Sequence, residues 1–326
     1  MKRINRVVVL AVALATPMVL AQGAFAQGYP SKRITLLIGY GAGTNVIDLP
    51  TRLLGDKLEK RLGQPVTPEY RPGAQSQIAF DAVHNAEPDG YTLGLATIGL
   101  LTLPLNVKNY TLDPLRDLTP VGLYAASANP LMVLSSGKAP YKTLAEFVAY
   151  AKANPGKISI GGIGSSMQME MAMLEKKGGF KLTPVAYKGR PQMVSDLMAG
   201  DLDAMISDYD PNKQFIAEGR MNLLGVGSTE RIPDLAKTPS ISEVIPGYEI
   251  TSFWFGIIAP PKTPESIVNR LNDAINRSMQ EADVAPAILK IGMKPLTGSV
   301  ADFRAFLLRD KAKFTEAANL IGLKPQ

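Results

Sequence analysis

The sequence contains no cysteine and only one histidine, His84. Disulfides, Cys/His zinc sites and Cys–His nucleophile pairs are therefore excluded. A Ser-His-Asp arrangement would have to use His84, which falls near the end of a predicted helix over residues 76–85. A surface histidine close to a helix C-terminus, where its charge is favoured, is the simpler interpretation. We therefore expect no catalytic role for His84, no bound metal and no cofactor.

Long apolar runs are also absent, except at the N-terminus. Basic residues among the first six positions precede the uncharged run Val7–Leu20, and Ala24–Ala26 supplies a small-x-small cleavage pattern before Gln27. This order predicts a signal peptide over residues 1–26. The run is shorter than the ~20 residues that cross a bilayer, so a retained anchor is the weaker alternative. With no cysteine at the cleavage site to carry a lipid, we expect a periplasmic, unanchored, soluble monomer.

The basic character of the chain comes partly from this leader. Without its three basic residues the 35 Lys and Arg fall to 32, against 29 Asp and Glu. The remaining charges are interspersed, which is typical of a solvated surface. The composition therefore gives no support for a nucleic-acid partner.

The 300 residues from Gln27 to Gln326 are more than one core usually holds. Short apolar runs alternate with helical patterns in two series, which favours parallel sheets covered by helices. The first series has expected strands at 34–38, 65–70 and 91–96. The second has them at 131–134, 158–160, 184–187, 204–207 and 223–226, with helices at 143–153 and 191–199.

The end of the chain predicts a return to the first lobe. Phe253–Ala259 is apolar and aromatic, like a strand, and helical patterns follow over 264–279 and 300–319. We therefore expect two connections between the lobes and C-terminal helices on the first lobe. The expected limits are 27–125 with 250–326 for the first lobe and 126–249 for the second.

Each series contains a buried strand that runs into a glycine-rich turn and then a helix. The turns are Gly39–Asn45 and Gly161–Ser166. Glycine allows a sharp turn and close approach of a ligand, and the following helix start favours an anion. Capping alone would also explain Gly, Ser and Thr at such turns. Neither turn fits a dinucleotide fingerprint or a P-loop, so a nucleotide is disfavoured.

Polar residues follow other expected strands, where ligands bind in open parallel sheets. Thr97 follows the third strand, Tyr187 and Lys188 follow another, and Asp208 follows Ser207. Lys188 is equally well explained as a solvated lysine, and Asp208 as a helix cap or hinge partner. Trp254, the only tryptophan, favours packing at the interlobe crossing over stacking on a ligand.

Several ordered motifs resemble those of one known family. They are Tyr29-Pro30, Pro88–Leu93, Tyr110–Pro114 with Asp117–Val121, Tyr187–Gly189, and Trp254–Gly256 followed by Ala259-Pro260. Spread over essentially the whole chain after the leader, they resemble the Bug-type solute receptors of tripartite tricarboxylate transporters. The resemblance implies a two-lobed α/β fold of the type II periplasmic-binding-protein kind, each lobe a mostly parallel sheet flanked by helices. It also implies a small carboxylate in a cleft between the lobes, and membrane transporter subunits as partners.

Both turns depart from the family pattern. The first contains Gly41–Asp48 in place of Pro-Pro-Gly-Gly-x-Thr-Asp, and in the second Met167 and Gln168 replace the usual Ser and His. These changes favour a bulkier or partly apolar acid, such as an aromatic or medium-chain dicarboxylate, over citrate. Carried over by position, the expected ligand-binding residues are Tyr40, Ala42, Gly43, Thr44, Asn45, Asp48, Thr97, Gly162, Gly164, Ser165, Ser166, Met167, Gln168, Tyr187, Lys188 and Asp208.

Two other functions remain open from the sequence. An extracytoplasmic sensor receptor would use the same closing lobes to present a carboxylate to a signalling membrane protein. An envelope enzyme would need Asp48, Asp208 or Lys188 as acid or base. Of the three, we favour a binding protein without enzymatic activity.

Overall fold

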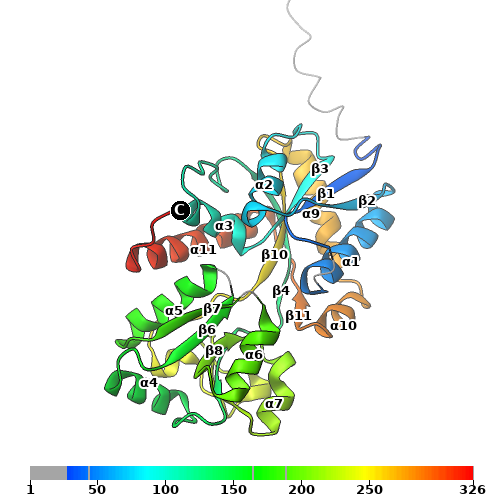
Figure 1. Ribbon diagram of the computed structural model, residues 1–326. Helices are drawn as coiled ribbons and strands as arrows, with labels where there is room; N and C mark the ends of the chain where they lie inside the picture. Colours follow the sequence, from blue (N-terminus) through cyan, green and yellow to red (C-terminus); the bar gives the residue numbers. More distant parts are fainter. Residues whose placement is uncertain (1–27, 43–44, 164, 188, 326) are drawn as a thin grey trace, which may run out of the picture.

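The computed structural model describes residues 28–42, 45–163, 165–187 and 189–325 (Figure 1). They form two α/β lobes, each built on one sheet. The upper sheet in Figure 1 has the order β11-β4-β10-β3-β1-β2, and the lower sheet has the order β7-β6-β8-β5-β9. The predicted signal peptide lies outside the described residues. Among the helices of the described ranges, none has the length and apolarity needed to cross a membrane.

The strands of the upper sheet are β1 (Ile34–Ile38), β2 (Val66–Tyr70), β3 (Thr92–Ala96), β4 (Thr119–Ser127), β10 (Trp254–Ala259) and β11 (Met293–Pro295). Those of the lower sheet are β5 (Met132–Ser136), β6 (Ser159–Ile163), β7 (Thr183–Tyr187), β8 (Ala204–Ser207) and β9 (Met221–Val226). The helices are α1 (Asn45–Leu62), α2 (Gln77–His84), α3 (Ile98–Asn106), α4 (Leu144–Ala153), α5 (Ser165–Gly178), α6 (Arg190–Ala199), α7 (Lys213–Ala217), α8 (Ile241–Val244), α9 (Glu265–Met279), α10 (Val284–Leu289) and α11 (Val300–Leu320).

Most strands of each sheet run in one direction, as predicted. In the upper sheet β2 and β3 are parallel to β1, whereas β10 is antiparallel to both β3 and β4. In the lower sheet β7 and β8 are parallel to β6, whereas β5 is antiparallel to both β8 and β9. The short edge strand β11 is antiparallel to β4, and the other two reversed strands, β5 and β10, are those that the chain enters from the other lobe. Their reversal follows from the direction of entry.

The crossing segments pair with each other where the lobes join. The backbone N–H of Ser127 donates to the carbonyl of Phe253 at 2.8 Å, and Trp254 pairs with Ala126 in the β4–β10 ladder. The chain thus changes sheet between β4 and β5 and returns between β9 and β10. The two predicted connections are confirmed, while the predicted limits 125/126 and 249/250 stay a prediction.

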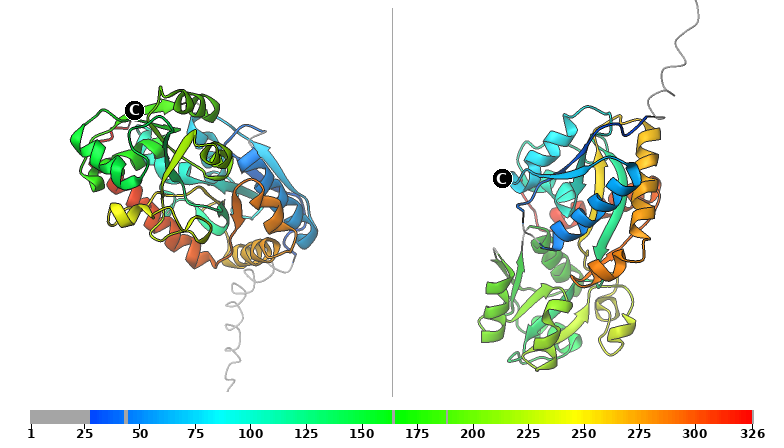
Figure 2. Two further views of the ribbon diagram at one scale, coloured as in Figure 1. Left: turned by 90° about the horizontal axis from the view of Figure 1, so that it is seen from below. Right: turned by 90° about the vertical axis from the view of Figure 1, so that its right-hand side faces the viewer.

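Helices cover both faces of the upper sheet. Residues Ile34, Leu36 and Ile38 of β1 face one core, with α1 and α9, whereas Leu37 faces another, which contains α2, α3 and α11. This alternation is the two-residue period of a strand. The right-hand view of Figure 2 shows α9, in gold, along one side of the upper lobe.

Helix α11 contacts both lobes. It packs on β4 and α3 of the upper lobe, but it also packs on α5 of the lower lobe, which lies directly beneath it in Figure 1. The C-terminal helices thus lie on the first lobe, as expected, and α11 in addition contacts the second. The core on this side is continuous across the junction, because it contains Phe303 and Leu307 of α11 together with the buried side chains of α5.

Besides the short helices α7, α8 and α10, one helix and two strands were not predicted from the sequence. Helix α3 has the sequence IGLLTLPLN, which is apolar throughout and contains Pro104, so no helical period is visible. Strand β4 contains Pro120 and Gly122, which are rare in a central strand. Strand β11 is only three residues long. A further correction concerns β6, which extends to Ile163 and so includes Gly161 and Gly162, predicted to lie in a turn.

Candidate functional site

The predicted residues of the upper lobe lie at the ends of β1 and β3. The hydroxyl groups of Tyr40 and Thr97 are hydrogen-bonded at 2.9 Å, which joins the two strand ends. Thr97 also caps α3, because its Oγ1 accepts from the N–H of Gly99 at 3.2 Å. Ala42 is exposed. Gly43 and Thr44 lie outside the described residues, and Asn45 is the first residue of α1.

Asp48 lies in the first turn of α1 and is buried. It takes part in a hydrogen bond with the hydroxyl of Tyr70 at the end of β2; this bond and, above all, burial raise the pKa of Tyr70. Arg52, one turn further along α1, donates to the same hydroxyl at 2.7 Å. Asp48 thus belongs to a network that fastens the start of α1 to the neighbouring strand.

The predicted residues of the lower lobe follow β6, as expected, but they divide between surface and core. Gln168 is exposed and Ser166 half-buried, whereas Met167 is 3% exposed and packs in the core. Gly162 is buried in β6, where a β-carbon would lie 2.8 Å from Met167 Cβ. Glycine is therefore needed here for the close approach of α5. Ser165 is the first residue of α5, and Gly164 lies outside the described residues.

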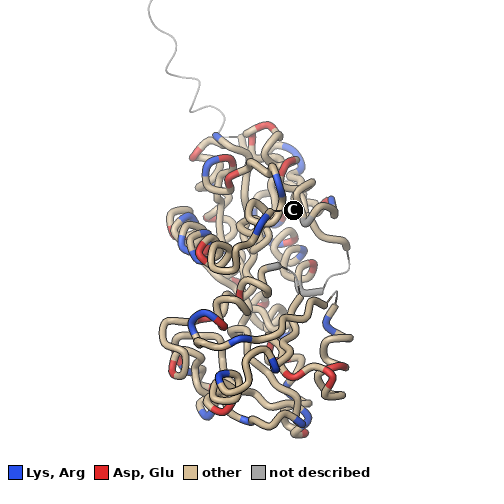
Figure 3. The backbone as a smooth tube through the Cα atoms, turned by 60° about the vertical axis from the view of Figure 1, so that its left-hand side comes forward, with Lys and Arg blue, Asp and Glu red and all other residues tan. Residues whose placement is uncertain are grey.

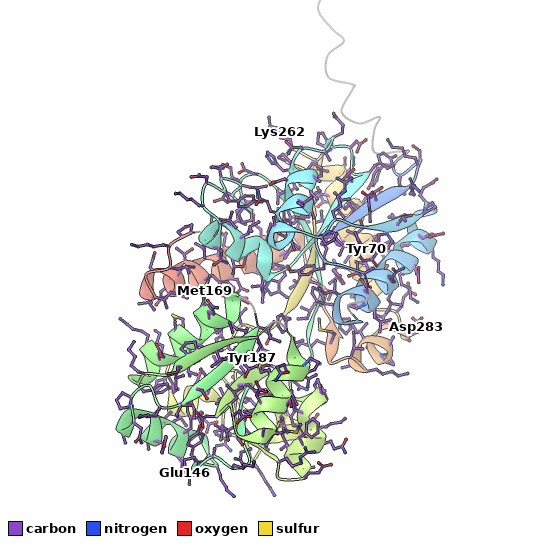
Figure 4. The ribbon with its side chains drawn as sticks, in the orientation of Figure 1. Tyr70, Glu146, Met169, Tyr187, Lys262 and Asp283 are labelled. Carbon is purple, nitrogen blue, oxygen red and sulfur yellow. The ribbon has the colours of Figure 1, made fainter. Side chains whose placement is uncertain are left out.

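Tyr187 ends β7 and Asp208 follows β8, so both lie at carboxyl ends of parallel strands. Figure 4 shows Tyr187 on the side of the lower lobe that faces the upper lobe. Its hydroxyl donates to Asp196 Oδ2 at 2.8 Å, and burial, the larger cause, together with this carboxylate raises the pKa of Tyr187 to about 12. Lys188 lies outside the described residues.

Arg190 is a candidate site residue that the sequence analysis missed. It begins α6, and Gly189, at the N-cap position, has no side chain to cap the free N–H groups. The guanidinium donates from Nη2 to Asn212 Oδ1 at 3.1 Å, but its buried Nε has no hydrogen-bond partner among the described residues. Burial lowers the pKa of Arg190, and the charge of Asp208 opposes that shift.

Asp208 is the acidic residue that interacts electrostatically with Arg190. Burial raises the pKa of Asp208, and the positive charge of Arg190 opposes this. Asn212 is fully buried and holds the loop by donating to the backbone oxygen of Asp208 at 2.6 Å and to Ser207 Oγ at 3.3 Å. The ends of β7 and β8 therefore carry a half-buried cation beside a half-buried acid.

One signal in the sequence could have revealed Arg190. A basic residue in the first turn of a helix faces the positive end of the helix dipole, which is locally unfavourable. Such a conflict between a residue and its element is expected mainly at functional sites.

The other sequence candidates are accounted for by packing or backbone contacts. Trp254 is 2% exposed and lies edge-on to Phe303 and Phe306 of α11, which confirms its predicted packing role at the crossing. His84 lies in the last turn of α2, and its Nδ1 is 2.9 Å from the backbone oxygen of Asp117. In the part of the chain that the structure describes, no three His, Asp or Glu side chains are grouped to hold a metal ion.

Two α/β lobes, two crossing segments, and strand ends that lead into helix starts define the class of two-lobed solute-binding proteins. A family model described as "Tripartite tricarboxylate transporter family receptor" matches residues 51–323, and the chain belongs to this family.

Individual proteins agree with this assignment. A UPF0065 protein of Bordetella bronchiseptica is 32% identical over 318 residues, covering 96% of this chain and 93% of the relative. The structure "R. palustris Rpa4515 with adipate" is 28% identical with a TM-score of 0.74, covering 91% of this chain and 100% of the other. "Structure of periplasmic binding protein BugD" is 26% identical with a TM-score of 0.71, and the coverage is again 91% and 100%. The predicted resemblance to Bug-type receptors is thereby confirmed.

Proposed function

We propose that this protein is a periplasmic receptor that captures a small dicarboxylate and delivers it to the membrane subunits of a tripartite transporter. The main supporting observation is the matched placement of two helix starts. Helix α1 follows β1 in the upper lobe and α5 follows β6 in the lower lobe, and Figure 1 shows both strands ending toward the junction of the lobes. Helix N-termini offer free N–H groups and a positive dipole end to an anion.

The first carboxylate would be held at these two helix starts. We propose for this role Tyr40, Ala42, Gly43, Thr44, Asn45, Asp48 and Thr97 of the upper lobe and Gly162, Gly164, Ser165, Ser166, Met167, Gln168, Tyr187, Lys188 and Asp208 of the lower lobe. Within this set, Asp48, Gly162 and Met167 would act as supports, since the first joins α1 to β2 through Tyr70 and the other two pack α5 on β6.

The second carboxylate would bind Arg190. A guanidinium that is partly desolvated and bonded to a neutral amide retains donors for an anion, and a bidentate carboxylate is its best partner. The R. palustris neighbour is a structure with adipate, a six-carbon diacid, which supports a medium-chain dicarboxylate. Because Met167 packs in the core, the preference for a partly apolar acid rests on this neighbour and on Gln168 rather than on the methionine.

A carboxylate screen of the mature protein tests this function. Thermal-shift and calorimetric titrations should show stabilisation by adipate or an aromatic dicarboxylate, because ligands that bind only the native state raise its melting temperature. Hexanoate, which has the same chain but one carboxylate, should bind more weakly. Stabilisation by citrate or tartrate but not by six-carbon or aromatic diacids would contradict the proposed ligand class.

Replacement of Arg190 tests whether this residue binds the second carboxylate of the ligand. In Arg190→Ala the affinity for adipate should fall by about 10- to 100-fold, corresponding to the loss of a charge-assisted bidentate contact. Hexanoate affinity should change little, because its single carboxylate would occupy the two helix starts. Lys213→Ala, on the nearby helix α7, provides a control on the same side of the lobe. Equal losses for both acids would show that Arg190 supports the lobe rather than the second carboxylate.

We also propose that the protein has no enzymatic activity. The acids that could serve in catalysis are engaged in structural contacts, Asp48 with Tyr70 and Asp208 with the charge of Arg190. Turnover of a bound acid by the purified protein, followed by mass spectrometry, would overturn this.

A further inference from the structure

A hollow of ≈ 460 Å³ lies against the segments that join the lobes, and its described walls include no residue of the two glycine turns. This volume is within the range of small-molecule sites. The walls come from both crossing segments, from Gly227 and Ser228 of the lower lobe, and from α11. We call it the hinge hollow.

Two buried polar groups in the wall of the hinge hollow have no partner among the described residues. Asp310 is 6% exposed, and its Oδ2 is buried without a hydrogen bond. Trp254 is 2% exposed, and the same is true of its Nε1–H group. Buried donors and acceptors are nearly always satisfied by protein, water or a ligand, because leaving them unpaired costs free energy. The unpaired atom of Asp310 is a carboxylate oxygen, which accepts hydrogen bonds, and that of Trp254 is an N–H donor.

The charges around Asp310 leave its carboxylate available. On its own helix, Arg309 approaches Asp310 Oδ1 only to 3.9 Å, and its guanidinium lies 5.2 Å from the ring centre of Phe306. Lys313 is bound elsewhere, to Glu170 Oε1 at 3.2 Å and to the backbone oxygen of Glu249 at 2.9 Å. Glu170 on α5 and Glu249 on the crossing segment add negative charge. Because Arg309 and Lys313 affect the pKa of Asp310 more strongly than these two acids do, the attraction for a cation comes from the Asp310 carboxylate itself.

The aromatic wall favours the same type of ligand. The rings of Trp254 and Phe306 are 5.2 Å apart at an interplanar angle of 86°. An organic ammonium ion is attracted both to such ring faces and to a carboxylate. An oxygen atom on the same molecule would accept from Trp254 Nε1–H.

We propose that the hinge hollow binds a small organic ammonium ion that also carries a hydroxyl or carbonyl oxygen. Its ammonium group would donate to Asp310 Oδ2, and its oxygen would accept from Trp254 Nε1. Since the walls belong to both lobes and both crossing segments, such a ligand affects lobe closure whenever it prefers one closure state. This inference is independent of the identity of the carboxylate in the main site.

Ethanolamine is the probe, with propylamine lacking the oxygen and ethylene glycol lacking the ammonium group. In isothermal titration calorimetry of the mature protein in phosphate buffer at pH 8, ethanolamine should bind at least tenfold more tightly than either analogue. Equal binding of ethanolamine and propylamine, or no binding of ethanolamine, would overturn the proposal.

The pH dependence identifies the carboxylate. Burial is the main cause that raises the pKa of Asp310 to about 6. An ammonium ion needs the ionised form, so the Kd for ethanolamine should be nearly constant above pH 7 and rise about fivefold from pH 6 to pH 5. A Kd that does not change over this interval would exclude Asp310 as the partner.

Two variants separate the contacts. Asp310→Asn should lower ethanolamine affinity at least tenfold and abolish the pH dependence, whereas Trp254→Phe should lower ethanolamine affinity to that of propylamine. Glu316→Gln removes an acid from the same helix outside the hollow and should leave binding unchanged. If Asp310→Asn kept the wild-type affinity, the site would lie elsewhere. If Asp310→Asn failed to fold, the analogue series and the pH profile of the wild type would show whether Asp310 binds the ammonium group.

Discussion

At the residue scale, Glu170 is the most deeply buried acid of the lobe junction among the described residues, with an exposure of 1%. It accepts from the N–H of Thr251 at 3.0 Å and from Tyr248 Oη at 3.1 Å, and Lys313 of α11 supplies its counter-charge at 3.2 Å. Glu170 therefore joins α5, the second crossing segment and α11. A buried carboxylate of this kind is tolerated only while its partners are present.

Removing the cation should be costly. We expect Lys313→Met to lower the free energy of unfolding by about 3 kcal/mol, because Glu170 would be left as an uncompensated buried charge. Urea denaturation measures the change. The control is Arg277→Met, which breaks the exposed pair with Asp273 and should cost less than about 0.5 kcal/mol. Similar losses in both variants would show that the Glu170 contacts contribute little.

Asp310 gives a second prediction, for stability against pH. Burial, as the main cause, raises its pKa from 3.8 to about 6, so the native state binds more protons than the unfolded state between these values. The stability contributed by Asp310 is therefore greatest at low pH and decreases as the pH rises from about 4 to about 6. Above pH 6 the ionised group costs about 3 kcal/mol relative to its protonated form.

The variant Asp310→Asn lacks this titration. Relative to wild type, its free energy of unfolding should increase by about 2.5 kcal/mol between pH 4 and pH 7, as followed by urea denaturation at both pH values. Taking the difference between the proteins cancels the titration of all other groups. Glu316→Gln, at an exposed position of α11, should show no such change. Parallel pH profiles for wild type and Asp310→Asn would contradict the prediction.

Some candidate site residues could be proposed from the sequence and others could not. Tyr187 and Asp208 were proposed as ligand contacts because ligands bind at the ends of parallel strands, and the structure has both residues at the ends of β7 and β8. Arg190 was missed because it falls between the Tyr187–Gly189 motif and the predicted helix over 191–199. The burial of Met167 could not be predicted, since it depends on how α5 is rotated against β6.

At the scale of elements, α5 shows why its surroundings could not be predicted. Met167, Met169, Met171 and Met173 alternate with other residues, and all four are buried. On a helix this spacing places side chains on opposite faces, so both faces must be covered. One face packs on β6 and β7 and another on α3 and α11, and Figure 4 shows Met169 where α5 lies beneath α11. Helix α11, which covers part of this other face, begins more than 100 residues after the end of α5. A local sequence pattern does not reveal such a contact.

Strand β10 and helix α11 are in close contact at Gly256. A β-carbon at this position would overlap with the ring of Phe303, which is 1% exposed and confined by the core. We expect Gly256→Ala to lower the free energy of unfolding by about 2 kcal/mol, because α11 would have to move away from β10. Urea denaturation measures this. Gly28→Ala, where a β-carbon meets nothing within 4 Å, should stay within about 0.5 kcal/mol of wild type.

The strands were predicted more reliably than their order. Runs such as Ile34–Ile38 and Ala204–Ser207 are identified by composition alone. The antiparallel insertion of β5 and β10 depends on the direction in which the chain enters each lobe, which a local pattern does not contain. The two lobes themselves were expected from the chain length, the two series of strands and the returning strand over 253–259, and the resemblance to known receptors agreed with them.

At the scale of the whole molecule, the two lobes are joined by more than their crossing segments. The continuous core through α5, α3 and α11 connects them on one side, and methionine, with its flexible side chain, makes such contacts adaptable. Figure 3 shows basic and acidic residues interspersed over both lobes, without a large area of one sign on the visible face. This distribution agrees with a small-molecule ligand better than with a polyanion.

Closure of the lobes is the last prediction, and the absence of cysteine makes it directly measurable. Cysteines can be introduced at Asp56 of α1, in the upper lobe, and at Ser195 of α6, in the lower lobe. Spin labels attached to them report the distance between the lobes. A ligand that contacts both lobes stabilises the closed form in proportion to its preference for it. Adding the best-binding dicarboxylate should therefore shorten the distance by several ångströms in double electron–electron resonance.

A second label pair separates closure from local changes. Labels at Asp56 and Lys108 both lie in the upper lobe and should keep their distance when the ligand binds. An unchanged distance between Asp56 and Ser195 in fully bound protein would mean that the α5–α11 contact fixes the lobes. Binding would then involve only one lobe or a preformed site. If both pairs changed, the upper lobe itself would deform, which the covering of both faces of its sheet by helices argues against.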